Sequence, residues 1–225
     1  MKDRIYLFCN KGFGKNFYLE FQSFAILNKK YECIVVFSIK TSGEKGFRYF
    51  VKYIKAILDT EYLIYLLKYF KTGGCMPIAV ENVNSQKFFA GVPLGSQGFV
   101  AGFNQIFSEQ LIERFANLIN FHPSILPFYR GAIPSYWVLR NNEPTTGFTA
   151  HRMTSKIDCG EILYQEIIPV DQEMTENELD KKIAFIAAEY FKECLVAITQ
   201  GRSFKRKTVE SPYKNNVGYV SSKRN

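Results

Sequence analysis

The chain has 225 residues, 47% of them hydrophobic and 22% charged, and a formal net charge of +8. This length allows one sizeable core, and five scattered cysteines without a Cys-x-x-Cys pair argue against a disulfide scaffold or a zinc site and for a reducing compartment. No apolar run approaches the roughly 20 residues of a membrane span, and the N-terminal run is too short for a signal peptide, which predicts a cytoplasmic protein.

The N-terminal part alternates strand and helix patterns. Residues 4–9 and 33–39 are typical of buried strands, and a glycine turn and a helical run lie between them. This order predicts an α/β fold with a doubly wound, Rossmann-like, mostly parallel sheet. The Gly12-x-Gly14 pair would let backbone amides approach a phosphate. Phe17 stands where the dinucleotide fingerprint needs its third glycine, so an NAD site is excluded.

Residues 41–74 form an inserted segment whose aromatic and aliphatic pattern predicts two helices. A substrate lid or a membrane-facing amphipathic surface is the functional interpretation, and simple core packing is the preferred one. The excess positive charge gathers in this segment and after residue 200. Such clusters attract anionic ligands, which include a phosphorylated substrate, nucleic acid and an anionic membrane. For the last dozen residues a solubilising surface is the simpler interpretation.

Further along the chain, five short runs predict strands, at 77–80, 98–102, 118–121, 148–153 and 162–168. Ser108 is expected to cap a short helix, and Pro134 is expected to open another. Thr175-Glu-Asn-Glu178 is a capping-box start for a long helix that stops at Gly201. We therefore expect one main domain over 1–200, with the helical insertion 41–74, and a short basic C-terminal extension over 201–225.

Both histidines stand in short polar frames, Asn120-Phe-His122-Pro-Ser-Ile-Leu-Pro-Phe-Tyr-Arg-Gly131 and Thr149-Ala-His151-Arg-Met-Thr-Ser-Lys-Ile-Asp158-Cys-Gly160. The prolines of the first frame place Asn120 and His122 at the carboxyl end of a strand, where open α/β sheets bind ligands. Taken singly, these residues are typical of a turn, a structural histidine and an Asp-x-Gly turn. Together they supply an amide donor, an acid/base group and an orienting carboxylate, which is a set for acyl transfer.

These frames resemble the formyltransferases that use 10-formyltetrahydrofolate. That family carries Asn-x-His-Pro-Ser-Leu-Leu-Pro-x-Tyr-Arg-Gly, then Gly-x-Thr-x-His, with Asp seven positions after the His and Gly two positions later. The second pattern corresponds here to Gly147, Thr149, His151, Asp158 and Gly160. A third stretch, Ala101-Gly-Phe-Asn-Gln-Ile-Phe-Ser108, is similar to the segment whose backbone lines the pterin pocket in relatives. The likeness runs from about residue 99 to about residue 199.

The resemblance implies a role for each polar residue. Asn120 would donate its amide to the formyl oxygen, and His122, protonated at that moment, would add a second donor. Asp158 would orient His122 and help to accept the proton of the amine, directly or through water. His151 would hydrogen-bond near Asp158 and support the loop. No metal is expected, because the folate carries the formyl group in activated form.

The resemblance also implies the binding contacts. For 10-formyltetrahydrofolate, backbone contacts are expected from Phe103, Asn104, Gln105, Ile106 and Phe107, with the Asp158 loop closing the other side. Some relatives have a basic residue where this chain has Gln105. Ordinary core packing is the alternative for Phe103, Ile106 and Phe107. Contacts with the acceptor are expected from Asn10, Lys11, Gly12 and Arg130.

The family divides by acceptor into glycinamide ribonucleotide, methionyl-tRNA and nucleotide-linked amino sugars. The Pro134-x-x-Trp137 pattern is similar to the last two branches, and the chain ends too soon for the further domain of roughly 100 residues that the tRNA enzymes carry. We therefore expect N-formylation of a dTDP- or UDP-linked amino-deoxy sugar for surface polysaccharide such as lipopolysaccharide O-antigen, without nucleic-acid or membrane partners. Family members with sugar substrates often form homodimers, and the sequence leaves the oligomeric state of this chain open. The alternatives are glycinamide ribonucleotide formyltransferase and a non-catalytic basic module that binds RNA or membrane.

Overall fold

The computed structural model describes residues 3–10, 13–39, 51, 55, 67, 70, 71, 73–213, 217–220 and 223. The chain divides into two compact units, Met1–Asn117 and Leu118–Asn225. Most of the predicted helical insertion 41–74 lies outside the described residues. The predicted domain limits, 1–200 and 201–225, stay predictions.

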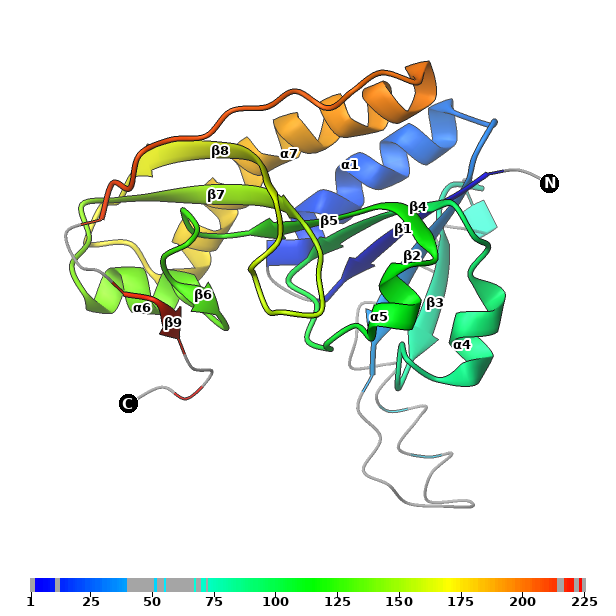
Figure 1. Cartoon of the computed structure of the whole chain (residues 1–225), viewed down its shortest axis with the longest axis horizontal. Helices are drawn as coiled ribbons and strands as arrows, with labels where there is room; N and C mark the ends of the chain where they lie inside the picture. Colours follow the sequence, from blue (N-terminus) through cyan, green and yellow to red (C-terminus); the bar gives the residue numbers. More distant parts are fainter. Residues whose placement is uncertain are drawn as a thin grey trace. The chain divides into compact units, whose positions relative to one another are not determined.

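The first unit is built from parallel strands joined by helices (Figure 1). In chain order its elements are β1 (Arg4–Cys9), α1 (Phe13–Leu27), β2 (Glu32–Ser38), β3 (Met76–Val80), α4 (Gln86–Gly91), β4 (Ser96–Ala101) and α5 (Glu109–Ile112). Strand β1 pairs with β2 and β4, and β2 pairs with β3, all in parallel. The predicted α/β class with a mostly parallel sheet is confirmed.

Both faces of β1 are covered, since successive side chains of a strand point to opposite faces. On one face the Phe8 ring packs edge-on against Phe88 of α4 and Phe107. On the other face, Cys9 lies against Gly14 of α1, where an added Cβ would overlap Ala101 O. Gly14 is therefore explained by close packing of α1 on the strands. Helices on both sides (Figure 1) give the doubly wound arrangement that the sequence predicts.

The second unit holds most of β5 (Phe115–His122), and its sheet is antiparallel. The elements that follow are β6 (Arg130–Gly131), α6 (Pro134–Arg140), β7 (Thr145–Arg152), β8 (Ile162–Pro169), α7 (Glu176–Gln200) and β9 (Tyr219–Val220). Strand β7 pairs with both β5 and β8 in antiparallel register. Strands β6 and β9 form a separate parallel pair. The sequence did not predict α4, β6 or β9, because each is only a few residues long.

Helix α7 begins and ends as the sequence predicts. Thr175 and Glu178 form a capping box, and Gly201 ends the helix in a left-handed conformation with φ +63°. The buried face of α7 packs on the antiparallel strands, where the Phe191 ring meets Phe121 edge-on at 5.8 Å.

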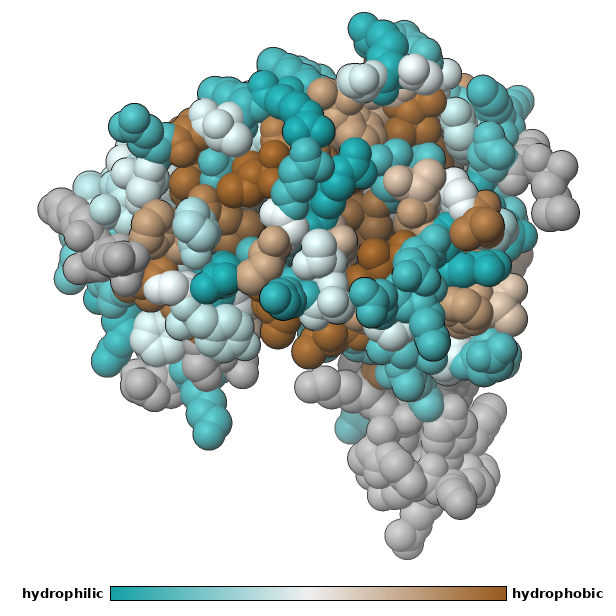
Figure 2. All heavy atoms as spheres, in the orientation of Figure 1, coloured by the Kyte–Doolittle hydropathy of each residue, from teal (hydrophilic) through white to brown (hydrophobic). Residues whose placement is uncertain are grey.

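The basic segment after α7 returns along β8. Lys207 exchanges backbone hydrogen bonds with Leu163 and Gln165. Its side chain pairs with Glu166 at 3.0 Å, and the side chains before it, Lys205 and Arg206, also pair with glutamates. Figure 2 shows hydrophilic side chains over the end of α7 and the segment that follows it. These three cations are thus used within the unit, so they give little support to an anion-binding role for this part of the tail.

Candidate active site

Strand pairing puts the predicted polar residues next to one another. Asn120 and His122 end β5, and because they are two residues apart their side chains leave the same face of the strand. In the pair with β7, Asn120 lies opposite His151, and His122 lies opposite Thr149. Residues that lie opposite each other in an antiparallel pair are side-chain neighbours. The register of β5 and β7 therefore brings Asn120 beside His151 and places His122 at the next position on the same face.

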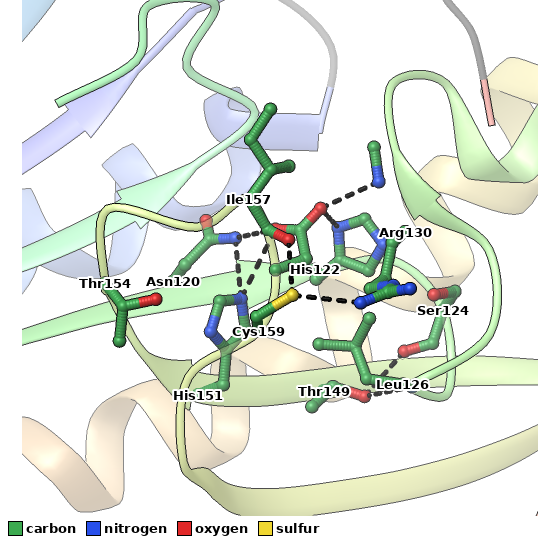
Figure 3. A network of polar contacts seen from close by, with 12 residues as sticks. Asn120, His122, Ser124, Leu126, Arg130, Thr149, His151, Thr154, Ile157 and Cys159 are labelled. Atoms are coloured by element: carbon green, nitrogen blue, oxygen red, sulfur yellow. Dashed lines mark hydrogen bonds and ion pairs between the residues drawn. The ribbon is translucent and has the colours of Figure 1, made fainter. Parts of the chain in front are cut away.

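The loop after β7 returns Asp158 to the side chains of Asn120, His122 and His151. Figure 3 shows these three side chains within one network of polar contacts. Arg152 N–H donates to Glu161 O at 2.9 Å, which closes the loop. A Cβ on Gly160 would overlap Arg152 O, so the closure requires glycine there. Asp158 has φ +49°, in the left-handed region that Asp adopts more readily than most residues. This tight turn aims the carboxylate at Asn120.

The Asp158 carboxylate is held by four groups. Its Oδ2 accepts from Gly131 N–H (2.8 Å) and lies 3.6 Å from His122 Nδ1. Its Oδ1 accepts from Asn120 Nδ2 (3.3 Å) and lies 3.5 Å from His151 Nε2. Burial opposes the charge, but the nearby imidazoles of His122 and His151 and the Gly131 N–H outweigh burial and lower the pKa to about 2. The Gly131 and Asn120 bonds do not depend on the charge of His122, so Asp158 stays ionised in either state of the imidazole.

His122 is a buried imidazole whose tautomer follows from its contacts. Its Nε2 lies 2.8 Å from Tyr129 O, and because a carbonyl oxygen only accepts, we assign the proton to Nε2. Burial lowers the pKa of His122, and the Asp158 charge and the Tyr129 carbonyl offset this only in part. We therefore assign a neutral resting state, with an unprotonated Nδ1 facing Asp158. A proton that arrives at Nδ1 would be stabilised by that carboxylate.

His151 holds the amide of Asn120. Its Nδ1 lies 2.9 Å from Arg152 O, which assigns the proton to Nδ1 and leaves Nε2 as an acceptor. Asn120 Nδ2 donates to this Nε2 at 3.1 Å. The two amide hydrogens of Asn120 are thus directed to His151 and Asp158. His151 lies where the predicted supporting role places it, and the role itself stays a prediction.

Arg130 reaches the same loop from β6. Its Nη1 donates to Cys159 Sγ at 2.9 Å (Figure 3), and Cys159 follows Asp158 in the chain. Cys159 is the exposed member of the five cysteines, and the other four are buried. A cation therefore contacts the residue that follows Asp158. The predicted contact of Arg130 with the acceptor stays a prediction.

Gln105 of the predicted folate segment has a structural use in the first unit. Its Oε1 accepts from Val83 N–H at 2.9 Å, and its Nε2 donates to Ser38 Oγ at 2.7 Å and to Glu81 O at 3.1 Å. These bonds tie the segment to residues at the ends of β2 and β3. The Gln105 side chain is thus used within the first unit, and the predicted backbone contacts with folate stay predictions.

The neighbours of Gln105 divide into packed and exposed residues. The Phe107 ring is buried and packs against Phe8 (4.9 Å) and Phe103 (5.8 Å). Ile106 is 66% exposed, and Asn104 is exposed as well. Core packing therefore accounts for the two phenylalanine rings but not for Ile106. The folate contacts of this segment, which lies in the first unit, stay predictions.

The predicted acceptor loop is only partly described. Asn10 Oδ1 accepts from Ser38 N–H at 3.1 Å, which orders the end of β1. Lys11 and Gly12 lie outside the described residues. The phosphate contact of this loop stays a prediction.

Two backbone groups of the site were not singled out from the sequence. The Tyr129 carbonyl fixes His122, and the Gly131 N–H fixes Asp158. Both belong to the Tyr-Arg-Gly end of the first frame, so the motif contains them. Nothing in their side chains shows this use, because the contacts are made by the main chain.

The assembled site can stabilise an oxyanion and accept a proton. Asn120 supplies an N–H donor, His122 a buried base, and Asp158 a charge that favours the protonated imidazole. Within the part of the chain that the structure describes, no group of three His, Cys, Asp or Glu residues could hold a metal ion. Among the same residues, no helix is long and apolar enough to cross a membrane.

An α/β fold thus carries an Asn-His-Asp set at the end of β5 and in the loop after β7. Residues 98–195 match the family model described as formyl transferase. The chain is 39% identical over 101 residues to the bifunctional polymyxin resistance protein ArnA of Wigglesworthia glossinidia brevipalpis, covering 44% of this chain and 15% of that protein. It is 37% identical over 105 residues to the methionyl-tRNA formyltransferase of Clostridioides difficile, covering 46% of this chain and 34% of that enzyme. The matches thus span well under half the length of these curated relatives.

Solved structures share the fold. A sugar N-formyltransferase from a Shewanella species superposes with a TM-score of 0.65 at 20% identity, covering 98% of this chain and 76% of that one. The N-formyltransferase of Helicobacter canadensis, solved with folinic acid and dTDP-3-aminofucose, gives 0.59 at 20% identity, covering 99% and 71%. Glycinamide ribonucleotide transformylase 1 of Symbiobacterium toebii gives 0.62 at 17% identity, covering 93% and 95%.

Proposed function

We propose that the protein is an N-formyltransferase that moves the formyl group of 10-formyltetrahydrofolate to an amine. The observation that carries the proposal is the Asp158 carboxylate, which lies 3.6 Å from His122 and accepts a hydrogen bond from Asn120. The family match over 98–195 supports the same reaction.

The geometry assigns a step to each group. The acceptor amine attacks the formyl carbon, and the charge that develops on the formyl oxygen needs a donor. Asn120 Nδ2 makes two hydrogen bonds, to His151 at 3.1 Å and to Asp158 at 3.3 Å. Because the bond to Asp158 is the longer one, we assign its N–H as the donor that turns to the formyl oxygen. The new carbon–nitrogen bond forms, the bond to the folate nitrogen breaks, and one proton must pass from the amine to the folate nitrogen.

His122 and Asp158 provide the route for that proton. At rest His122 Nδ1 is free to accept it, and the imidazolium that forms is paired with Asp158. Asp158 itself is a weak base, because its pKa is lowered to about 2. The carboxylate therefore acts mainly by stabilising the protonated His122. The protonated histidine that the sequence predicts as a second donor then arises during turnover.

For the acceptor, we propose a dTDP- or UDP-linked amino-deoxy sugar, formylated in the cytoplasm by a homodimer as a precursor of surface polysaccharide such as O-antigen. The Pro134-x-x-Trp137 pattern, the cation Arg130 beside the catalytic loop, and the fold shared with enzymes solved as sugar N-formyltransferases support this choice. Glycinamide ribonucleotide is the second candidate, because the solved transformylase is matched over 95% of its length.

A mass-spectrometric transfer assay tests both parts of the proposal. The protein and 10-formyltetrahydrofolate would be offered dTDP- and UDP-amino sugars, glycinamide ribonucleotide and methionyl-tRNA in parallel. We expect a formyl mass gain on one sugar nucleotide. Asn120→Ala should abolish the gain, whereas Asn117→Ala, which removes another asparagine of β5, should retain it. A gain on another acceptor would replace the proposed substrate, and no gain on any acceptor would refute the proposed reaction for this chain.

A further inference from the structure

The C-terminal strand β9 lies against the segment that holds the catalytic side chains. Its pairing with β6 sets Arg130 opposite Tyr219 and Gly131 opposite Val220. Three successive backbone bonds fasten the two segments: the N–H groups of Tyr129, Arg130 and Ala132 donate to the carbonyls of Val217 (2.8 Å), Gly218 (2.9 Å) and Val220 (3.3 Å). The segment 129–132 is therefore hydrogen-bonded along one side by residues 217–220.

The other side of the same segment faces the site. In a strand, backbone groups alternate in direction along the chain. The N–H groups of Arg130 and Ala132 point to residues 217–220. Between them, Gly131 N–H points the opposite way and donates to Asp158 Oδ2 at 2.8 Å. The Tyr129 carbonyl accepts from His122 Nε2 at 2.8 Å. One short segment thus connects β9 to both catalytic side chains.

The contact between the two strands is close and leaves little freedom. A Cβ on Gly131 would lie 2.5 Å from Val220 O and 2.8 Å from the Tyr219 ring, so glycine is needed for this approach. Gly131 also has φ +102°, which side chains disfavour. Val220 is buried, with 5% of its surface exposed. A displacement of β9 would consequently move Gly131.

We propose that residues 217–220 form a positioning strand for the catalytic site. By engaging Tyr129, Arg130 and Ala132, the strand directs Gly131 N–H at Asp158 and the Tyr129 carbonyl at His122. Part of the C-terminal extension is thus a component of the active site. This inference rests on the proposed formyl transfer, and it makes Val220 a positioning residue, since its side chain secures β9 without contacting the reacting groups.

Three variants of the full chain test the proposal. Val220→Asp puts a charge in a buried position and should release β9. Misplacing catalytic groups by about 1 Å can cost about 100-fold in rate, so we expect a loss of kcat of that order, with a donor KM within about twofold of wild type. Val220→Ile keeps an apolar side chain at this position and should retain the turnover of wild type. Leu195→Ala, which removes a buried side chain of α7, should lower stability without this loss of kcat.

The pH profile separates positioning from simple destabilisation. The acid limb of kcat reports protonation of His122, the proposed proton acceptor. Without the Tyr129 carbonyl bond the pKa of His122 should fall further, so the acid limb should move to lower pH in Val220→Asp and stay in place in Leu195→Ala. Wild-type kcat and pH profile in a folded Val220→Asp variant would overturn the proposal. If that variant does not fold, Val220→Ala replaces it, and it must lower kcat more than Leu195→Ala does.

Hydrogen exchange of the wild-type protein provides a test that needs no activity. The amides of Arg130 and Ala132 should be protected as strongly as those of β7 if β9 holds them. Exchange at the rate of an exposed loop would overturn the proposal. If the wild type transfers no formyl group, the proposed function fails, whereas the exchange result still decides whether β9 braces the segment.

Discussion

Replacing Asp158 with asparagine removes the charge of the site with little change in shape. Asn is among the residues that tolerate the left-handed conformation found at position 158, where φ is +49°. The introduced amide can keep an oxygen toward Gly131 N–H and turn its nitrogen toward the acceptor Nε2 of His151. We therefore expect Asp158→Asn to fold, and its effects to report the charge.

The size of the stability effect follows from the pKa of Asp158. The pKa falls from an ordinary 3.8 to about 2 on folding, which corresponds to about 2 kcal/mol of stability. Because the folded pKa is the lower one, this stability is fully present above about pH 4 and is lost as the pH falls toward 2. An amide does not titrate. The difference in unfolding free energy between wild type and Asp158→Asn should therefore be about 1 kcal/mol smaller at pH 3 than at pH 7.

Urea unfolding at the two pH values measures this difference, and the transfer assay measures the catalytic effect. We expect kcat to fall by about 100-fold to 10,000-fold, as for the loss of an acid/base partner. Asp171→Asn, which neutralises an exposed carboxylate of the same unit, should change neither quantity appreciably. A pH-independent stability difference would refute the assigned ionisation of Asp158, and near-normal turnover would remove it from the mechanism.

N-ethylmaleimide should alkylate the exposed Cys159 thiol first and lower formyl transfer, because the adduct stands in the loop that carries Asp158. Mass spectrometry of the labelled peptide identifies the modified residue, and transfer by Cys159→Ser should resist the reagent. Tyr213→Phe removes the hydroxyl that accepts from Ile125 N–H at 2.8 Å and should cost about 1–3 kcal/mol in urea unfolding; an unchanged midpoint would contradict this. Gly160→Ala would overlap Arg152 O and should abolish transfer, and a variant with normal turnover would show that the loop can adjust.

The sequence was sufficient for the long elements and for the grouping of the site residues. The apolar run of β1 and the capping box at Thr175 are formed by residues that are close in the sequence. Such elements can therefore be predicted from the sequence alone. Asn120, His122 and Asp158 were grouped because their motifs occur together, and the register of β5 against β7 then explains physically why Asn120 meets His151.

The contacts missed by sequence reasoning are made by the main chain between distant residues. Strand β6 spans Arg130–Gly131, and its partner β9 lies some 90 residues later. Two-residue strands have no periodicity, so only the tertiary pairing reveals them. The tail was interpreted from its charge, yet Lys207 pairs with Glu166 and the segment beyond it reaches the site through backbone carbonyls.

The backbone near the site departs from regular structure at the points where the catalytic groups are fixed. Tyr129, Ile133 and Asp158 all have positive φ values, of 54°, 50° and 49°. Such conformations cost free energy in non-glycine residues and persist only where the surroundings determine them. Here the surroundings include the Val217 carbonyl for Tyr129 and the Gly131 and Asn120 hydrogen bonds for Asp158. The same contacts that hold Tyr129 and Asp158 in place thus offset the strain of these conformations, which supports the proposed positioning role of residues 217–220.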